Sequence, residues 1–266
     1  MPRRPRWTES SRRHGTMNIT FTGWRYFFDF INQLFLDYRS YIFRGQARQV
    51  WHLESTLDRL LSRTGQIRSR RMREDHLERF LLAARGRRGS NPPRIEGDNE
   101  WWALGQHHGL ATPLLDWSES PFVALYFAFE DRNDGGSAYR VVYALHCPGV
   151  EDKSAGIARR SRRRGGRIRP AITEIVRPKS DENPRLVSQR GLFTRGPDGM
   201  TIDAWIRKNF PKNRQEAVLI RFRIPNNNRD QCLRFLNRMN INHLSLFPDL
   251  YGAARYCNYD IMIDGY

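Results

Sequence analysis

The side chains with which this chain could do chemistry lie in a few short polar segments, each beside an apolar run. Arg44 directly follows residues 41–43, an apolar stretch that predicts a short buried strand. A guanidinium at a rigid strand end can hold two phosphate oxygens at once, so Arg44 predicts an anion-binding site. A structural salt bridge from Arg44 to Asp116 or Asp249 is the alternative interpretation. The candidate binding residues are Arg44, His107, Thr112, Asp116, Ser120 and Gln189.

Most of these candidates fall within residues 101–131, where polar side chains lie between two apolar runs. A short helix is expected to end at Gly109, because glycine is favoured just after a helix. Ser120 followed by Pro121 is typical of the N-cap and first position of a second, largely buried helix. Residues 110–119 between them predict an ordered loop held at both ends. Free amides at the start of the second helix would add to an anion site.

The polar residues of this loop also have structural interpretations. Asp116 follows two leucines, so we expect a partly buried carboxylate that orients Arg44 or His107, with direct catalysis as the alternative. Thr112 and Ser120 are expected as turn and cap residues. Adjacent histidines face apart and have no acidic or cysteine partner at ligand spacing, so no metal site is predicted.

Charge predicts the macromolecular partner. The 266 residues include 45 Lys and Arg against 28 Asp and Glu, a formal net charge of +17 that concentrates polyanions. Nucleic acid, RNA or DNA, is therefore the expected partner. Residues 1–16 predict a disordered basic arm, and residues 154–170 predict an exposed insertion or long loop that binds phosphates. The arginines of this insertion are Arg159, Arg160, Arg162, Arg163, Arg164, Arg167 and Arg169.

The elements that must position these residues indicate one main domain over residues 17–266. Helices are predicted mostly in the first half and strands in the second, so we expect an α+β fold with a helical N-terminal half packed on a mixed or antiparallel sheet. No apolar run is long enough for a membrane span, and we expect a cytoplasmic protein without a membrane partner. Predicted helices are residues 23–37, 72–84, 100–108, 121–129 and 230–239; predicted strands are residues 41–43, 139–145, 173–176, 185–194 and 217–224.

The order of these motifs resembles the FRG domain, a family named for its Phe-Arg-Gly signature. The resemblance runs from about residue 24 to residue 256, and it departs from the family pattern at His108 and Ala111, where an aromatic ring and a proline are usual. The segments that carry it are residues 43–46 (FRGQ), 106–117 (QHHGLATPLLDW), 120–128 (SPFVALYFA), 189–193 (QRGLF) and 246–250 (LFPDL).

A second resemblance is to ADP-ribosyltransferases of the arginine-serine-glutamate type. Their order is an aromatic-Arg-Gly at a strand end, a serine-bearing segment leading into a helix, and a later acid; residues 43–45 and 118–120 are similar to the first two. The Ser-Thr-Ser and Gln/Glu-x-Glu motifs of that family are absent. The resemblance implies NAD as co-substrate, Arg44 on its diphosphate, and Asp249 or Glu216 as the acid. Asp249 as a helix N-cap is the structural alternative.

Two hypotheses of different class follow. The first is an intracellular effector with an ADP-ribosyltransferase-like core that uses NAD to modify nucleic acid, in a bacterial toxin or phage-defence role and with an antitoxin as a possible partner. The second is a non-catalytic nucleic-acid- or nucleotide-binding module, in which Arg44 and the loop bind phosphate or a nucleotide. For Gln189, beside Gly191, a position close to the cleft and a strand bulge are the two interpretations. A nuclease is disfavoured, because the sequence shows no cluster of acids for a metal site.

Overall fold

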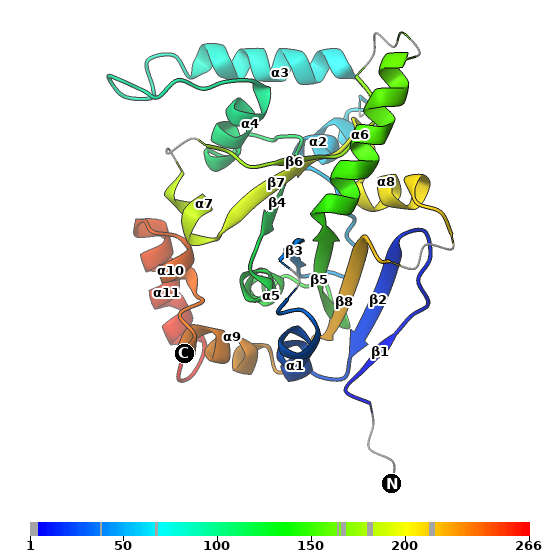
Figure 1. Ribbon diagram of the computed structural model, residues 1–266. Helices are drawn as coiled ribbons and strands as arrows, with labels where there is room; N and C mark the ends of the chain where they lie inside the picture. The colour runs from blue at the N-terminus through cyan, green and yellow to red at the C-terminus, as the bar shows by residue number, and fades with distance from the viewer. Residues whose placement is uncertain are drawn as a thin grey trace.

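An eight-stranded sheet runs through the molecule in the order β1-β2-β8-β5-β3-β4-β7-β6 (Figure 1). The computed structural model describes residues 5–37, 39–66, 69–163, 165, 169–179, 183–212 and 216–266. Strands β2 and β8 are parallel and all other neighbouring strands are antiparallel, so the mixed sheet is confirmed. The strands are β1 (Trp7–Glu9), β2 (Thr16–Phe21), β3 (Tyr41–Gln46), β4 (Leu114–Ser118), β5 (Tyr139–His146), β6 (Glu174–Val176), β7 (Gly191–Arg195) and β8 (Leu219–Pro225).

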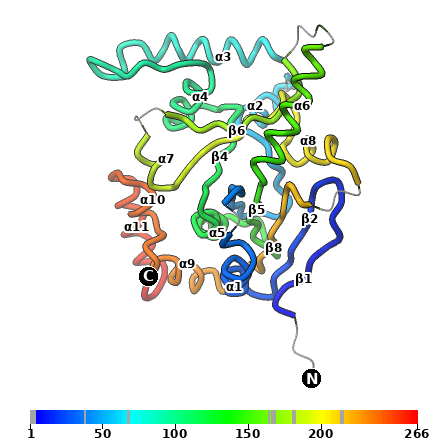
Figure 2. Tube along the Cα trace, viewed as in Figure 1, coloured from blue at the N-terminus to red at the C-terminus, as the bar shows by residue number. Residues whose placement is uncertain are grey.

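Helices cover both faces of the sheet (Figures 1 and 2). Helices α1, α5, α9 and α11 pack on one face of β2, β8, β5 and β3, whereas α6 and α8 pack on the other. A third apolar cluster joins α2, α3 and α4 to β4, β6 and β7. The helices are α1 (Arg25–Leu34), α2 (Thr56–Arg63), α3 (Arg70–Ala83), α4 (Asp98–His107), α5 (Pro121–Glu130), α6 (Cys147–Arg163), α7 (Pro184–Ser188), α8 (Ile202–Asn209), α9 (Arg229–Arg238), α10 (His243–Leu246) and α11 (Leu250–Met262).

Helix α5 lies directly on β3, and Gly45 makes this contact possible. A Cβ at Gly45 would lie 1.9 Å from the Ala124 carbonyl oxygen and 2.6 Å from the Ala128 nitrogen. Both alanines are fully buried. The glycine of the Phe-Arg-Gly segment therefore allows a close helix-to-strand approach, which places the middle of α5 beside the end of β3.

The N-terminal segment forms strands, so the predicted disordered arm is wrong over residues 7–9, where β1 pairs with β2. Trp7 anchors this segment, because its ring packs edge-on against Phe30 with centroids 5.3 Å apart. Arg6 pairs with Asp29 at 3.2 Å. The basic composition of the segment predicted disorder, but the packing of Trp7 orders it. Residues 1–4 lie outside the described residues.

The predicted Arg-rich loop is also wrong over residues 154–163, which continue α6. Val150, Ser154 and Ile157 lie at helical spacing on one face, where Ser154 donates a 2.7 Å hydrogen bond to the Thr173 carbonyl. The charged residues take the other positions, so arginine density does not exclude a helix with one packed face. Arg159, Arg160, Arg162 and Arg163 are exposed on this helix, Arg169 pairs with Glu174 at 2.8 Å, and Arg164 and Arg167 lie outside the described residues.

Two further predictions are corrected by the pairing of β4 with β7. Residues 114–118 form a strand instead of part of a loop, because each of them pairs with a residue of β7. The predicted strand at residues 185–194 begins as helix α7, which Asn183 caps by accepting a hydrogen bond from Leu186. Half of the described strands come from residues before 133, so helices and strands are interleaved along the chain instead of segregated.

Within the described residues, no helix is long and apolar enough to cross a membrane.

Candidate functional site

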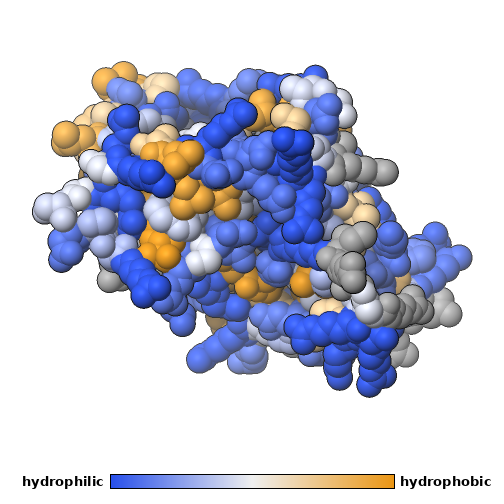
Figure 3. Space-filling model, turned by 90° about the horizontal axis from the view of Figure 1, so that it is seen from above, coloured by the Kyte–Doolittle hydropathy of each residue, from blue (hydrophilic) through white to orange (hydrophobic). Residues whose placement is uncertain are grey.

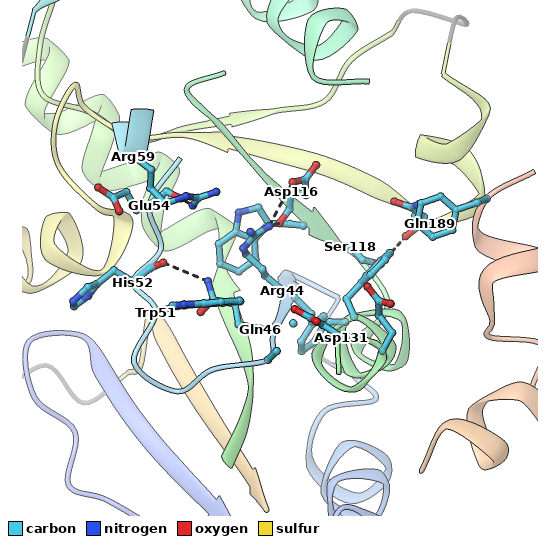
Figure 4. A pocket seen from close by; sticks show the side chains of 18 residues that line it. Arg44, Gln46, Trp51, His52, Glu54, Arg59, Asp116, Ser118, Asp131 and Gln189 are labelled. Atoms are coloured by element: carbon cyan, nitrogen blue, oxygen red, sulfur yellow. Dashed lines mark hydrogen bonds and ion pairs between the residues drawn. The ribbon is translucent and has the colours of Figure 1, made fainter. Parts of the chain in front are cut away.

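A cavity of about 670 Å³ opens at the ends of β3 and β4, beside α5 (Figure 4). One wall comes from β3 and the segment after it, residues 47–54, and the opposite wall comes from β4 and α5. The side chains that could bind a ligand are Arg44, Gln46, Trp51, His52, Glu54, Arg59, Asp116, Ser118, Phe127, Glu130, Asp131, Gln189 and Phe247. The site therefore collects residues from segments that are far apart in the sequence.

Arg44 is fixed in this cavity by Asp116, as one of the two interpretations of its role expected. Arg44 Nη1 donates a 2.7 Å hydrogen bond to the Asp116 carbonyl and lies 3.5 Å from Asp116 Oδ2. Burial lowers the pKa of the guanidinium, and Asp116 opposes this effect. Arg44 Nε has no hydrogen-bond partner among the described residues. One edge of the guanidinium is thus held while the side chain lines the cavity.

Asp116 itself differs from the expectation of a partly buried carboxylate, because its side chain is 65 % exposed. In β4 the neighbouring residues Leu115 and Trp117 point into the core, so alternation directs Asp116 away from it. Asp116 Oδ1 accepts a 2.6 Å hydrogen bond from Gln106 Nε2. The carboxylate is therefore held by α4 as well as by Arg44.

Thr112 supports the site from behind instead of lining it. It is fully buried, its hydroxyl donates to Gln106 Oε1, and its carbonyl accepts a 3.1 Å hydrogen bond from the Leu57 amide. A chain of contacts thus runs from Thr112 through Gln106 and Asp116 to Arg44. Gln106 was not selected from the sequence, although it belongs to the same motif as His107.

Ser120 caps α5 as predicted, with its hydroxyl accepting a 3.3 Å hydrogen bond from the Val123 amide. Ser118 lines the cavity; its hydroxyl accepts from the Ser120 amide at 3.0 Å and donates to the Gln189 carbonyl at 2.7 Å. Gln189 also lines the cavity, and it is the C-cap of α7 instead of a strand bulge. These bonds join α5 and α7 across one side of the cavity.

The two acids proposed from the sequence lie away from Arg44. Asp249 caps α11 by accepting a 2.9 Å hydrogen bond from the Gly252 amide, as its structural alternative expected. Its partner is Arg185, whose Nε lies 2.8 Å from Asp249 Oδ2. The hydrogen bond from the Gly252 amide and the contact with Arg185 both lower the pKa of the carboxyl. Glu216 is exposed just before β8. Neither carboxylate lines the cavity.

His107 is the last residue of α4 and does not line the cavity either. Burial lowers the pKa of its imidazole, and the charge of His108 adds to this effect. The charges of Arg185 and Asp249 also act on His107, the first lowering and the second raising its pKa. Among the described residues, no group of three or more His, Cys, Asp and Glu side chains could hold a metal ion.

Four carboxylates that do line the cavity are Glu54, Asp116, Glu130 and Asp131. Burial raises the pKa of Glu130, while the Tyr259 hydroxyl opposes the rise by donating to Glu130 Oε2 at 3.1 Å. Sequence reasoning missed Glu54, Glu130 and Asp131 because acids beside ordinary helix ends carry no distinctive spacing. They line one cavity only when α5 packs on β3.

Aromatic rings and a second cation complete the site. Trp51 is 40 % exposed, and Arg48 lies over its ring at 5.3 Å. Phe127 and Phe247 meet edge to face on the other side, with centroids 6.1 Å apart. Arg59 donates a 2.7 Å hydrogen bond to the Glu54 carbonyl. Guanidinium groups together with aromatic rings suit a ligand that combines phosphate with a flat ring.

The fold and the site define a mixed-sheet α/β protein with an arginine-bearing cavity at the end of a central strand. Residues 39–136 match the sequence model of the FRG domain family, which confirms the predicted resemblance over this span. The motifs at residues 189–193 and 246–250 lie outside the matched span. The match includes β3, β4 and α5, which form most of the cavity. No curated protein and no solved structure matches the chain.

Proposed function

We propose that the cavity beside Arg44 binds NAD and that the protein transfers ADP-ribose from it to nucleic acid. The observation that carries the proposal is the position of Arg44, fixed by Asp116 on one side and lining a cavity of about 670 Å³ on the other. This volume lies within the range of small-molecule sites, roughly 300–1,000 Å³. A guanidinium held in this way is suited to a diphosphate.

The cavity walls suit the chemistry of such a transfer. The bond between nicotinamide and ribose breaks with its electron pair leaving on nicotinamide, so positive charge develops on the ribose. A carboxylate near that charge stabilises it, and Glu54, Glu130 and Asp131 line the cavity. The acceptor then forms a bond to the same carbon and releases a proton. Glu130 suits the role of proton acceptor, since its raised pKa makes it a stronger base.

The acceptor is proposed to be nucleic acid because of the charge of the molecule. With a net charge of +17 the chain attracts polyanions, and Arg159, Arg160, Arg162 and Arg163 are exposed on α6. Hydrophilic side chains cover much of the face in Figure 3. Because none of these four arginines lines the cavity, they favour a second candidate function, a non-catalytic module that binds nucleic acid through α6.

Labelled NAD incubated with the protein and RNA or DNA tests the first proposal. We expect label on the nucleic acid and release of nicotinamide, with both reduced at least tenfold in Arg44→Lys, because an ammonium cannot reproduce the planar fork of the guanidinium. Arg25→Lys, on the exposed face of α1, is the matched control and should behave as the wild type. Absence of both label and nicotinamide with the wild type refutes the transfer reaction.

Binding experiments separate the second candidate. If charge reversal on α6 abolishes binding of nucleic acid while NAD neither binds nor changes, the protein is the non-catalytic module. If NAD binds by calorimetry and the Arg44→Lys variant loses that binding, the cavity is a nucleotide site whatever the acceptor is.

A further inference from the structure

Gln46 is the last residue of β3 and lines the same cavity as Arg44. Residues two apart in a strand point to the same face and lie roughly 7 Å apart. In a nucleotide, the ribose separates the phosphate from the ring by a similar distance. A ligand held at Arg44 by its phosphate can therefore reach Gln46 with the ring system attached to the same ribose.

The orientation of the Gln46 amide is set by the protein. Gln46 Nε2 donates a 3.3 Å hydrogen bond to the His52 carbonyl, a group that can only accept. The amide oxygen must therefore face the other way. The residue is 5 % exposed, and Oε1 is buried without a hydrogen-bond partner among the described residues. A buried acceptor left unpaired destabilises the folded protein, so an oriented one at a cavity wall indicates a missing donor.

The geometry points to Gln46 as the residue that recognises the carboxamide of nicotinamide, an inference that rests on the proposed function. A primary amide offers the N–H donor that Oε1 lacks, and a small shift of the cavity wall at Gln46 would bring this buried atom into contact with it. The ring that carries this amide is a pyridinium cation, which Trp51 and the cavity carboxylates favour. Gln46 thus selects the substrate by its leaving group, while Arg44 holds the diphosphate.

The adenine amino group is the rival donor on the same dinucleotide. It belongs to a neutral ring, so the carboxylates Glu54 and Asp131 would contribute nothing to its placement. If the adenine lay at Gln46 instead, the nicotinamide ribose would also lie farther from Gln46. Analogues that remove one donor at a time distinguish the two orientations.

Calorimetric titration of the full chain with three dinucleotides tests the inference. NAD has both donors. Its 3-acetylpyridine analogue has a methyl group in place of the carboxamide NH2, and its hypoxanthine analogue has a carbonyl in place of the adenine amino group and a hydrogen on the neighbouring N1. We expect the acetylpyridine analogue to bind about tenfold to a hundredfold more weakly than NAD, as removal of one hydrogen-bond partner from a buried acceptor predicts. The hypoxanthine analogue should bind like NAD.

Gln46→Leu provides the second readout, because it should bind NAD and the acetylpyridine analogue equally well. Gln231→Leu, exposed on α9, is the matched control and should keep the wild-type preference. If the wild type binds NAD and its acetylpyridine analogue with equal affinity, or if the hypoxanthine analogue is the weaker one, Gln46 does not recognise the carboxamide. If the wild type binds none of the three, the proposed function fails as well. The wild-type comparison decides the question even if Gln46→Leu does not fold.

Discussion

Replacement of Gly45 by alanine tests whether the close approach of α5 to β3 holds the site together. The added Cβ would lie 1.9 Å from the Ala124 carbonyl oxygen, where ordinary contacts begin at 3.4 Å, so the helix or the strand must move by about 1.5 Å. Both clashing groups are backbone atoms of elements buried in the core, and no side chain can rotate away. We expect a loss of stability at the upper end of the overpacking range, about 3 kcal/mol.

Urea unfolding followed by circular dichroism measures this loss, and thermal unfolding should show a midpoint lower by roughly 6–12 °C, if about 2–4 °C per kcal/mol holds for a chain of this size. The matched control is Gly156→Ala in α6, where the added Cβ meets only the Arg160 guanidinium at 3.7 Å. There alanine should stabilise the helix by about 0.5–1 kcal/mol. Equal stability of Gly45→Ala and the wild type would refute the account of the contact.

Four further predictions follow from other contacts. Burial lowers the pKa of His243 to about 4, whereas the pKa of an unperturbed histidine is near 6.5. The free energy of unfolding should therefore fall by about 2 kcal/mol from pH 7 to pH 5, because the unfolded chain binds a proton that the buried imidazole does not. In His243→Gln, urea unfolding at both pH values should no longer show this fall. Arg73→Ala leaves the Asp58 carboxylate buried without its partner and should cost about 3–5 kcal/mol in the same assay, a result that an unchanged urea midpoint would contradict. Asp249→Ala removes the N-cap of α11 and should lower the midpoint of thermal unfolding, while the affinity for NAD, measured by calorimetry, stays unchanged. A loss of NAD affinity would show that Asp249 takes part in binding. Glutamate at the four exposed arginines of α6 should reduce the salt dependence of binding to duplex DNA, with the slope of log K against log salt falling by about 0.9 for each phosphate that the protein no longer neutralises; an unchanged slope would mean that the nucleic acid binds to another surface.

Local patterns predicted the elements whose signals are contained in a few residues. Ser120 and Pro121 at the start of α5, the strand predicted at residues 139–145, and the glycine after α4 are examples, and all three are confirmed. Each depends on capping or periodicity that neighbouring residues alone determine. The contact of Arg44 with Asp116 was one of two pairings considered, and the structure selects it over Asp249.

The errors concern features that depend on distant partners. Residues 114–118 carry no clear strand signal, and they form β4 because β7, more than seventy residues later, pairs with them. The sequence does not predict the acids of the cavity for the same reason, since Glu54 and Glu130 line one cavity only through the packing of α5 on β3. In the N-terminal segment, the packing of Trp7 on Phe30 orders residues whose polar composition predicted disorder. The spacing of residues along the sequence does not indicate contacts between segments that are far apart in the chain.

The sheet order determines where the chain can be cut. Residues 39–136 keep β3 and β4, but β3 pairs along its whole length with β5, and β4 pairs along its whole length with β7. Among the described residues of this span, the strand pairing that remains is Phe43 with Ser118. A fragment with the boundaries of the FRG match would therefore expose two unpaired strand edges and lose Gln189 and Phe247 from the cavity. The matched segment is thus the middle of a larger folding unit, and expression trials should retain the strands on both sides of it.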